Sequence, residues 1–248
     1  MRIPTAPHPI LKEYYEHEDA RQPFVTALFD SAAQYYDRSC ALGSFGSGQF
    51  YRRWVLRHYG LGAGMKLLDV ATGTGLVARA ATKILVEPGA VVGLDPSAGM
   101  LREGRTGHSA LLVQGTVEAL PFCGDRFDFL SMGYALRHVA DLRVALAECL
   151  RVLKPGGRLL ILEISRPRSV VGRGLARGYL AKLLPLVMRR LTGSVQAEQL
   201  MKYHWDTIAT CVPPEAILDV LRTTGFVEVT WRARGGVLGE YRALKPAP

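Results

Sequence analysis

Short apolar segments alternate with helical segments along the middle of this chain, and no other feature of the sequence constrains the fold as strongly. Five segments are rich in Val, Leu and Ile and have the length of strands: "MKLLDVA", "AVVGLDP", "ALLVQGT", "FDFLSMGY" and "GRLLILEIS". Apolar strands of this kind are typical of a parallel sheet that is covered on both faces. Their alternation with helices predicts an α/β fold with a doubly wound parallel sheet.

The two ends of the chain depart from this alternation. Near the C-terminus, "VEVTWRAR" and "LGEYRALK" are separated by only a few residues around "GGV". A connection that short predicts an antiparallel hairpin, because parallel neighbours need a crossover. Near the N-terminus, residues 24–60 indicate helices broken by the glycine-rich stretch "LGSFGSG". We therefore predict an N-terminal helical arm or cap over residues 1–60 and a sheet domain over residues 61–248.

The composition narrows the class of protein. The 248 residues are 48% hydrophobic, as in an ordinary globular protein, and carry a formal net charge of +9. That charge indicates either an anionic partner or a basic surface without one. The four cysteines form no C-x-x-C pair, which favours free thiols in a reducing compartment and no metal site. The N-terminus has no apolar run typical of a signal peptide, and we expect a cytoplasmic protein without a transmembrane helix.

The stretch "LLDVATGTG" predicts a strand that runs into a glycine loop at a helix N-terminus. Gly73, Gly75 and Ala78 match the dinucleotide fingerprint G-x-G-x-x-G/A, and Asp95 lies 20 residues after Gly75. Asp69 argues against a dinucleotide, because its carboxylate would repel a pyrophosphate. The same carboxylate favours a ligand that carries an ammonium group.

S-adenosylmethionine has the properties that these residues require. It has no phosphate, so the glycines would serve only for close approach of the backbone. Its ammonium group suits Asp69, directly or through water, and its ribose diol suits a bidentate hydrogen bond with Asp95. Both acids follow strands whose carboxyl ends share one edge of the sheet, where open α/β sheets bind ligands. The alternative role for each acid is to cap a helix N-terminus.

Several motifs together resemble one known family. They are "LLDVATGTG", "VVGLDPSAGML", "EALPFCGDRFDFLSMGYALRHV" and "RVLKPGGRLLILEISRP", with "FDSAAQYYD" and "SFG" upstream. This set resembles the ubiquinone/menaquinone biosynthesis C-methyltransferases, which are class I S-adenosylmethionine-dependent methyltransferases, and covers about residues 24–165 well. The resemblance implies a Rossmann-like fold. Its seven-stranded, mostly parallel sheet ends in an antiparallel hairpin, with N-terminal helices and a helical lid at about residues 166–210.

The resemblance also implies a set of cofactor contacts. The family's glycine-loop threonine is Thr74 here, and its ribose acid is Asp95. The pair beside the adenine, Asp-Ala or Asn-Ala in the family, is Thr116 and Val117, and a serine at the end of the fourth strand is Gly133. With the residues argued above, the predicted cofactor-binding set is Asp69, Gly73, Thr74, Gly75, Asp95, Pro96, Met100, Thr116, Val117 and Gly133.

The family's Gly-Leu-Arg-Asn signature reads Ala-Leu-Arg-His in this chain, so His138 stands where the family has Asn. Carbon methylation of a phenol or hydroquinol needs a base near the hydroxyl and a cation near the phenolate. We predict His138 as the base or as a relay to water, Arg137 as the phenolate stabiliser, and Tyr36 as a residue that closes over the cofactor. The alternatives are an ion pair for Arg137, a cap or a buried position for His138, and core packing for Tyr36.

The departures from the family leave the acceptor open. The later Tyr-x-Tyr-Leu signature keeps only Tyr203. The first interpretation is C-methylation of an aromatic or quinol-type acceptor, and the second is O- or N-methylation of a natural product in secondary metabolism. A nucleic-acid methyltransferase is suggested by the charge, but no N-P-P-Y-type loop is present and we expect no nucleic-acid partner. The glycine fingerprint leaves an NAD-dependent oxidoreductase as a further class.

Residues 166–191 form a basic, amphipathic segment. No acidic residue occurs from Ile164 to Ala197, whereas this stretch contains Arg166, Arg168, Arg173, Arg177, Lys182, Arg189 and Arg190. One apolar helical stripe is predicted by the four-residue spacing of Val171, Leu175, Tyr179, Leu183, Val187 and Leu191. An element of this kind can lie on an anionic membrane, so we predict peripheral contact with the inner membrane face. The alternative is a packed lid with a solvated basic face, and the oligomeric state is left open.

Overall fold

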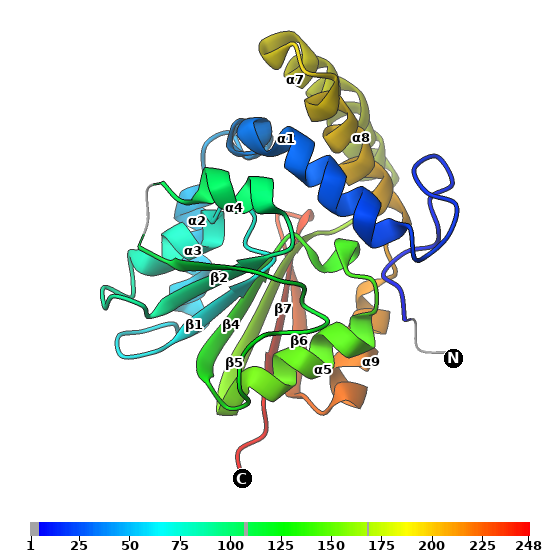
Figure 1. Cartoon of the computed structure of the whole chain (residues 1–248). Helices are drawn as coiled ribbons and strands as arrows, with labels where there is room; N and C mark the ends of the chain where they lie inside the picture. The colour runs from blue at the N-terminus through cyan, green and yellow to red at the C-terminus, as the bar shows by residue number, and fades with distance from the viewer. Residues whose placement is uncertain (1–4, 107–108, 168) are drawn as a thin grey trace.

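A seven-stranded sheet forms the centre of the molecule (Figure 1), in a computed structural model that describes residues 5–106, 109–167 and 169–248. The strand order is β3-β2-β1-β4-β5-β7-β6. The strands are β1 (Leu67–Val70), β2 (Val91–Asp95), β3 (Leu111–Gln114), β4 (Phe127–Gly133), β5 (Leu153–Ile164), β6 (Val227–Arg234) and β7 (Leu238–Leu244).

Strands β1 to β5 pair in parallel, and β7 pairs antiparallel with both β5 and β6. The predicted doubly wound sheet with a terminal hairpin is therefore confirmed. Every residue of β1 and β2 is buried, as expected for strands covered on both faces. In the register of the sheet, Asp69 lies between Gly93 and Ser131, so the carboxyl ends of β1, β2 and β4 meet at one edge.

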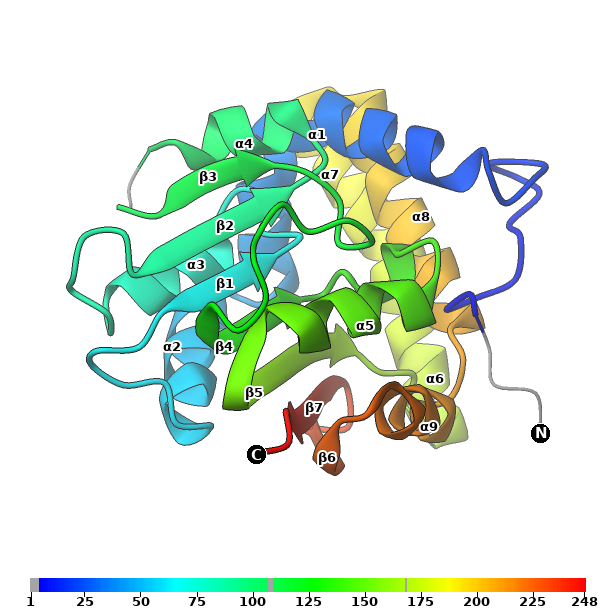
Figure 2. The same cartoon turned by 60° about the horizontal axis from the view of Figure 1, so that its bottom comes forward.

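Helices cover both faces of the sheet (Figure 2). Helices α5 (Leu142–Val152) and α9 (Pro214–Thr224) pack on one face, around Leu130, Met132 and Ile161. Helices α2 (Gly48–His58) and α3 (Leu76–Thr82) pack on the other face with Phe129 and Leu160. Helix α2 thus packs on the sheet, although it precedes the predicted domain boundary at residue 60. That boundary stays a prediction.

A third layer lies across the carboxyl-end edge of the sheet (Figure 1). It contains α1 (Arg21–Gly43), α7 (Leu184–Thr192) and α8 (Val195–Thr210), which share a core of Leu28, Met188 and Tyr203. Asp30 of α1 accepts hydrogen bonds from the Ser97 hydroxyl at 2.5 Å and the Gly99 N–H at 2.7 Å. These bonds tie α1 to the start of α4 (Ala98–Gly104), so α1 is fixed above the ends of the strands.

The stretch "KPGG", for which the sequence predicts a helix end followed by a turn, differs in part from that prediction. Helix α5 begins at the N-cap Asp141, whose carboxylate accepts the N–H groups of Arg143 and Val144, and it ends at Val152 as expected. The following residues were expected to form a turn, but they belong to the irregular start of β5. A register shift between Phe127 and Phe129 of β4 accommodates the extra residues, as in a β-bulge.

The lid begins with α6 (Val170–Ala176), which continues through a π-helical segment, η2 (Arg177–Leu183), into α7. Pro185 lies in the first turn of α7 and cannot donate a backbone hydrogen bond to the preceding turn, which favours an irregular helix at this point. None of the residues from Val170 to Leu183, all of them described, is buried. Over the described part of the chain, no helix combines the length and apolar character needed to span a membrane.

Candidate active site

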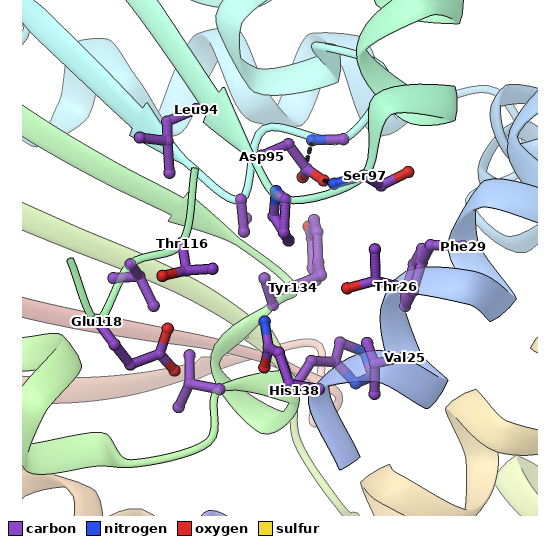
Figure 3. A pocket seen from close by; sticks show the side chains of 18 of the residues that line it. Val25, Thr26, Phe29, Leu94, Asp95, Ser97, Thr116, Glu118, Tyr134 and His138 are labelled. Carbon is purple, nitrogen blue, oxygen red and sulfur yellow. Dashed lines mark hydrogen bonds between the residues drawn. The ribbon is translucent and has the colours of Figure 1, made fainter. Parts of the chain in front are cut away.

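A cavity opens where the carboxyl ends of β1, β2 and β4 meet, and α1 forms its opposite wall (Figure 3). We call it the strand-end cavity. The predicted site residues that line it are Tyr36, Gly73, Asp95, Pro96, Thr116, Val117, Gly133 and His138. In Figure 3, Asp95 and His138 lie on opposite sides of this cavity, with Tyr134 between them.

The glycine loop is held against Asp95. Gly73 and Gly75 both have positive φ, at 58° and 81°, which glycine adopts without steric cost. The Gly73 N–H donates to one carboxylate oxygen of Asp95 at 2.8 Å, and the Ser97 N–H donates to the other at 2.9 Å. Burial raises the pKa of Asp95 to about 6, although these two hydrogen bonds act in the opposite direction. Each oxygen of Asp95 keeps acceptor capacity for a ligand hydroxyl in the cavity.

Asp69 does not line the strand-end cavity. Its carboxylate lies beneath the glycine loop and accepts hydrogen bonds from the hydroxyls of Thr72 at 2.6 Å and Ser131 at 2.7 Å. It also accepts the N–H of Ala78 in the first turn of α3 at 3.1 Å, which is the capping role named as the alternative. The burial of Asp69 raises its pKa to about 6. Its three bonds connect β1, β4 and α3, so Asp69 fixes the shape of the loop.

Three further predicted contacts also lie behind the cavity wall or shape it. The Thr74 hydroxyl donates to Asp37 of α1 at 2.5 Å, and Met100 is buried and does not line the cavity. Gly133 lines the cavity, and a Cβ at this position would lie 2.7 Å from Cγ2 of Val77. The glycine therefore allows α3 to pack against the end of β4.

Of the α1 residues that line the cavity, only Tyr36 was predicted from the sequence. The α1 wall and the loops after β2 and β3 add Gln22, Val25, Thr26, Phe29, Ser97 and Glu118 to the lining. The Glu118 carboxylate accepts the Ala140 N–H at 2.8 Å. Phe29 and Glu118 begin two of the motifs quoted above, and this was the only sequence signal for them.

A second cavity of about 380 Å³, which we call the lid cavity, adjoins the first. Its walls come from α1, α2, η2 and α8 and include Cys40, Tyr51, Arg52, Leu180, His204 and Trp205. Tyr36 and Tyr134 line both cavities, so the two meet at these rings. Tyr134 has φ of 63°, unusual for a residue other than glycine, and its N–H donates to the Leu162 carbonyl at 2.7 Å.

Arg137 borders the lid cavity but is engaged in an ion pair. Its guanidinium donates to Glu163 at 2.6 Å and to the Thr207 hydroxyl at 3.1 Å, and the side chain is almost fully buried. Glu163 also accepts the Leu136 N–H at 3.0 Å. This pairing is the alternative named for Arg137, and Glu163 already compensates the charge that was expected to stabilise a phenolate.

His138 lies in the 3-10 turn η1 (Leu136–His138), between the rings of Phe29 and Tyr203. Both of its ring nitrogens are buried, and neither has a hydrogen-bond partner among the residues that the structure describes. Burial and then Arg137 lower its pKa well below the usual range, so the imidazole is neutral at physiological pH. His204 of α8 lies 5.8 Å away by ring centroids, and its pKa is lowered by the same two causes.

Tyr36 lies at the junction of the cavities, with its ring 6.0 Å from Phe29 and 6.5 Å from His204 by centroids. Burial raises the pKa of its hydroxyl well above the usual value. The hydroxyl is therefore protonated at physiological pH and can donate a hydrogen bond. Whether Tyr36 closes over the cofactor stays a prediction, although its position is compatible with that role.

Comparison with known proteins identifies the family. The sequence profile of the ubiE/COQ5 methyltransferase family matches residues 15–245. The chain belongs to this family. A ubiquinone/menaquinone biosynthesis C-methyltransferase from Pseudomonas paraeruginosa is 32% identical over 237 residues, covering 92% of this chain and 91% of the relative. A demethylmenaquinone methyltransferase from Mycobacterium marinum is 33% identical over 226 residues, covering 90% and 94% of the two chains.

Solved structures confirm the fold. A crystal structure of an S-adenosylmethionine-dependent methyltransferase from Thermotoga maritima matches 88% of this chain and 98% of that chain, with a TM-score of 0.62 and 21% identity. Phosphoethanolamine N-methyltransferase 2 from Haemonchus contortus, in complex with S-adenosylhomocysteine, matches 79% of this chain and 52% of that chain, with a TM-score of 0.57 and 16% identity. The predicted Rossmann-like fold is therefore confirmed, and the family match confirms the predicted dependence on S-adenosylmethionine.

The residues of the strand-end cavity fit this cofactor. Asp95 presents a carboxylate for a diol, and Leu94, Val117 and Val139 provide apolar walls for an adenine ring. Asp69 accepts three hydrogen bonds within the protein and does not line this cavity, so its contact with the ammonium group, directly or through water, stays a prediction. Because the chain belongs to a methyltransferase family, the interpretation of the glycine loop as a dinucleotide site is wrong.

Proposed function

We propose that this protein transfers a methyl group to a ring carbon of an aromatic, quinol-type acceptor held in the lid cavity. The observation that supports this most strongly is the meeting of two cavities at Tyr36 and Tyr134. One cavity fits the cofactor, and the other has aromatic walls that suit a flat ring. The names of the relatives, which include a demethylmenaquinone methyltransferase, favour the same acceptor class.

In this proposal the strand-end cavity binds the cofactor through Asp95, Thr116 and Val117, with Gly73 in close backbone contact. S-adenosylmethionine supplies an electrophilic methyl group when it is bound. The residues of the chain must then orient the acceptor ring, exclude water and take up the hydroxyl proton.

We propose His138 as the group that takes up the proton, with His204 as its neighbour on the lid-cavity side. Both imidazoles are neutral, so each has a nitrogen lone pair that can accept a proton. His204 lines the lid cavity and His138 lines the strand-end cavity. Since their low pKa values make them weak bases, the acceptor hydroxyl must be made more acidic by another group.

The experiment that tests the proposed function is a mass-spectrometric screen of phenols, hydroquinols and aromatic amines as acceptors with S-adenosylmethionine. Fragmentation of each product shows whether the new methyl group is on carbon, oxygen or nitrogen. We expect carbon methylation of a hydroquinol. Methylation only on oxygen or nitrogen, across the whole panel, would contradict the proposal and favour the natural-product interpretation.

We also propose that the lid contacts an anionic membrane through residues 166–191. The predicted apolar stripe supports this, because Val171 is 73% exposed, Leu175 is 71% exposed and Leu191 is 63% exposed. An apolar stripe flanked by basic residues is typical of helices that lie in a membrane interface. A hydrophobic acceptor in the membrane would then be close to the lid cavity, which Leu180 and Leu184 border.

Two observations limit which cations can serve this contact. Arg189 donates to Glu198 at 2.7 Å, so an acid just beyond the acid-free stretch offsets part of the charge. Arg168 lies outside the described residues. Arg177 and Lys182 are both exposed on η2, so they are the cations that we expect to reach an anionic surface.

A further inference from the structure

Arg52 is a buried arginine without a carboxylate partner. Its side chain projects from α2 into the wall of the lid cavity, and the residue is only 6% exposed. Within the described residues, no ion pair or hydrogen bond engages its guanidinium, and its Nε is both buried and unpartnered. The contact it does make is with the ring of Tyr134, whose centroid lies 5.5 Å from the guanidinium carbon.

The carboxylates nearby have other partners. Glu163, which precedes the cavity residue Ile164, is paired with Arg137 at 2.6 Å. Glu240 accepts the hydroxyls of Tyr51 and Tyr59 and is paired with Arg234. The lid cavity therefore has one arginine that forms an ion pair and one that, among the described residues, forms none. The Asp69 carboxylate interacts electrostatically with Arg52 but makes no ion pair with it, because its own hydrogen bonds go to the glycine loop, β4 and α3. A buried charge is costly unless it is paired, so a guanidinium without an ion pair at a cavity wall indicates that a ligand supplies the anion.

The position of Arg52 within α2 adds to the positive potential. The guanidinium folds back toward the start of the helix, where a Cβ on Gly48 would lie 2.6 Å from its Nη1. The first turn of α2 contains no acidic residue, and the side chain of the N-cap Ser47 makes no capping hydrogen bond. The N-terminus of a helix favours an anion and disfavours a cation. An oxyanion bound beside Arg52 would interact favourably with its guanidinium and with the N-terminus of α2.

We infer that Arg52 binds the ionised oxygen of the acceptor, so that the acceptor reacts as a phenolate. This inference rests on the proposed function and identifies the residue that positions the ring and holds its charge. The hydroxyl proton leaves to a neutral imidazole or to water. The electron pair of the oxygen then raises the electron density of the adjacent ring carbon, which forms the new bond to the methyl group as the bond from carbon to sulfur breaks. Transfer of the ring proton from that carbon to water, with the C–H electron pair returning to the ring, restores the aromatic ring.

The contact between Arg52 and Tyr134 places this oxygen near the junction of the cavities. Tyr134 lines both, so a group bound by Arg52 lies beside the ring that faces the cofactor. Arg137 cannot replace Arg52 in this role without breaking its bond to Glu163. Arg52 is thus assigned the role that the sequence suggested for Arg137.

The test uses 4-nitrophenol, whose phenolate absorbs visible light, bound to the protein in the presence of saturating S-adenosylhomocysteine. The pH midpoint of its ionisation is compared between bound and free probe. We expect the bound probe to ionise at lower pH, and the midpoint to rise by about 1–3 pH units in Arg52→Gln, the range for an opposite charge nearby. Arg57→Gln is the matched control, because Arg57 is exposed on the same helix.

Binding of S-adenosylhomocysteine to each variant shows that the fold is intact. If Arg52→Gln loses that binding, Arg52→Met, which keeps the length of the aliphatic stem, is measured in the same way. A midpoint that is equal in the unmutated protein and in a folded Arg52 variant would refute the inference, as would a failure of the probe to bind. The mass-spectrometric acceptor screen tests the proposed function, and its result does not depend on the ionisation midpoint of the probe. Carbon methylation with no dependence on Arg52 would refute only this inference, whereas an Arg52-dependent midpoint without carbon methylation would refute only the proposed function.

Discussion

Acidification should weaken the binding of S-adenosylhomocysteine, because it protonates Asp95. This carboxyl is 7% exposed, and its burial raises its pKa to about 6. Above that pH the carboxylate can accept hydrogen bonds from both hydroxyls of a ribose, in addition to the N–H groups of Gly73 and Ser97. Below it, one oxygen carries a proton and loses acceptor capacity. A proton therefore competes with the ligand, and affinity should fall as the pH falls through this range.

The size of the effect follows from the pKa. At about pH 5 roughly one molecule in ten still carries an ionised Asp95, so the dissociation constant should be about tenfold higher than at about pH 7, equivalent to ~1.4 kcal/mol. Isothermal titration calorimetry at the two pH values measures this difference directly. Asp95→Asn is the control: it should bind more weakly at both pH values, by roughly 1.5–3 kcal/mol, and lose the pH dependence.

Two results would refute this reasoning. An affinity that does not change with pH in the unmutated protein would mean that the Asp95 carboxylate does not contact the ligand. A pH dependence that persists in Asp95→Asn would assign the proton to another group. Asp69 is the first candidate, because burial raises its pKa to about 6 as well. Asp69→Asn would identify it, provided that the variant still folds.

Three further changes test the rest of the site. Glu163→Gln should lower the free energy of unfolding in urea by about 3–5 kcal/mol, because it leaves Arg137 buried without its partner, and a much smaller loss would mean that the pair is dispensable. His138→Ala should lower the single-turnover rate of methyl transfer by ~10²–10⁴-fold with cofactor affinity nearly unchanged, and an unchanged rate would make His138 structural. The double variant Arg177→Gln, Lys182→Gln should weaken binding to anionic vesicles by about 1 kcal/mol per cation, whereas vesicle binding that is already absent in the unmutated protein would contradict membrane contact.

The edge of the sheet that carries the strand-end cavity could be predicted from the sequence. Parallel strands with both faces covered are continuous apolar runs, and their carboxyl ends must meet at one edge. Asp95, Thr116 and Gly133 all follow such runs and all line the cavity. Asp69 follows a similar run but turns under the loop, because Thr72, Ser131 and the start of α3 supply it with donors. Alternation alone does not distinguish an acid that faces a ligand from one that supports the loop.

The contacts of the third layer could not be predicted, because they depend on tertiary structure. The pairing of Arg137 with Glu163 joins residues 26 positions apart, and they become neighbours because Gly133 of β4 lies opposite Leu162 of β5. Arg52 is one of several basic residues in α2, and only its burial separates it from Arg57. A sequence shows how many arginines a helix has, but not which of them lacks a carboxylate in the folded protein.

The effect of Arg52 on the rate should depend on pH, for a reason that follows from the chemistry. A guanidinium beside a phenolate increases the fraction of acceptor that is ionised, but it also withdraws electron density from the ring. The first effect dominates where the free hydroxyl would be protonated, because the imidazoles of His138 and His204 are too weakly basic to remove the proton alone. The second dominates where the acceptor is ionised without help.

The rate of Arg52→Gln relative to the unmutated protein should therefore rise as the pH rises and approach or exceed equality above the ionisation of the acceptor. Single-turnover rates measured across this range on one hydroquinol would show it, with Arg57→Gln as the control. If Arg52 only supported the fold of the lid cavity, its loss would lower the rate by a similar factor at every pH. A constant ratio would therefore separate a structural arginine from one that holds the charge of the reacting oxygen.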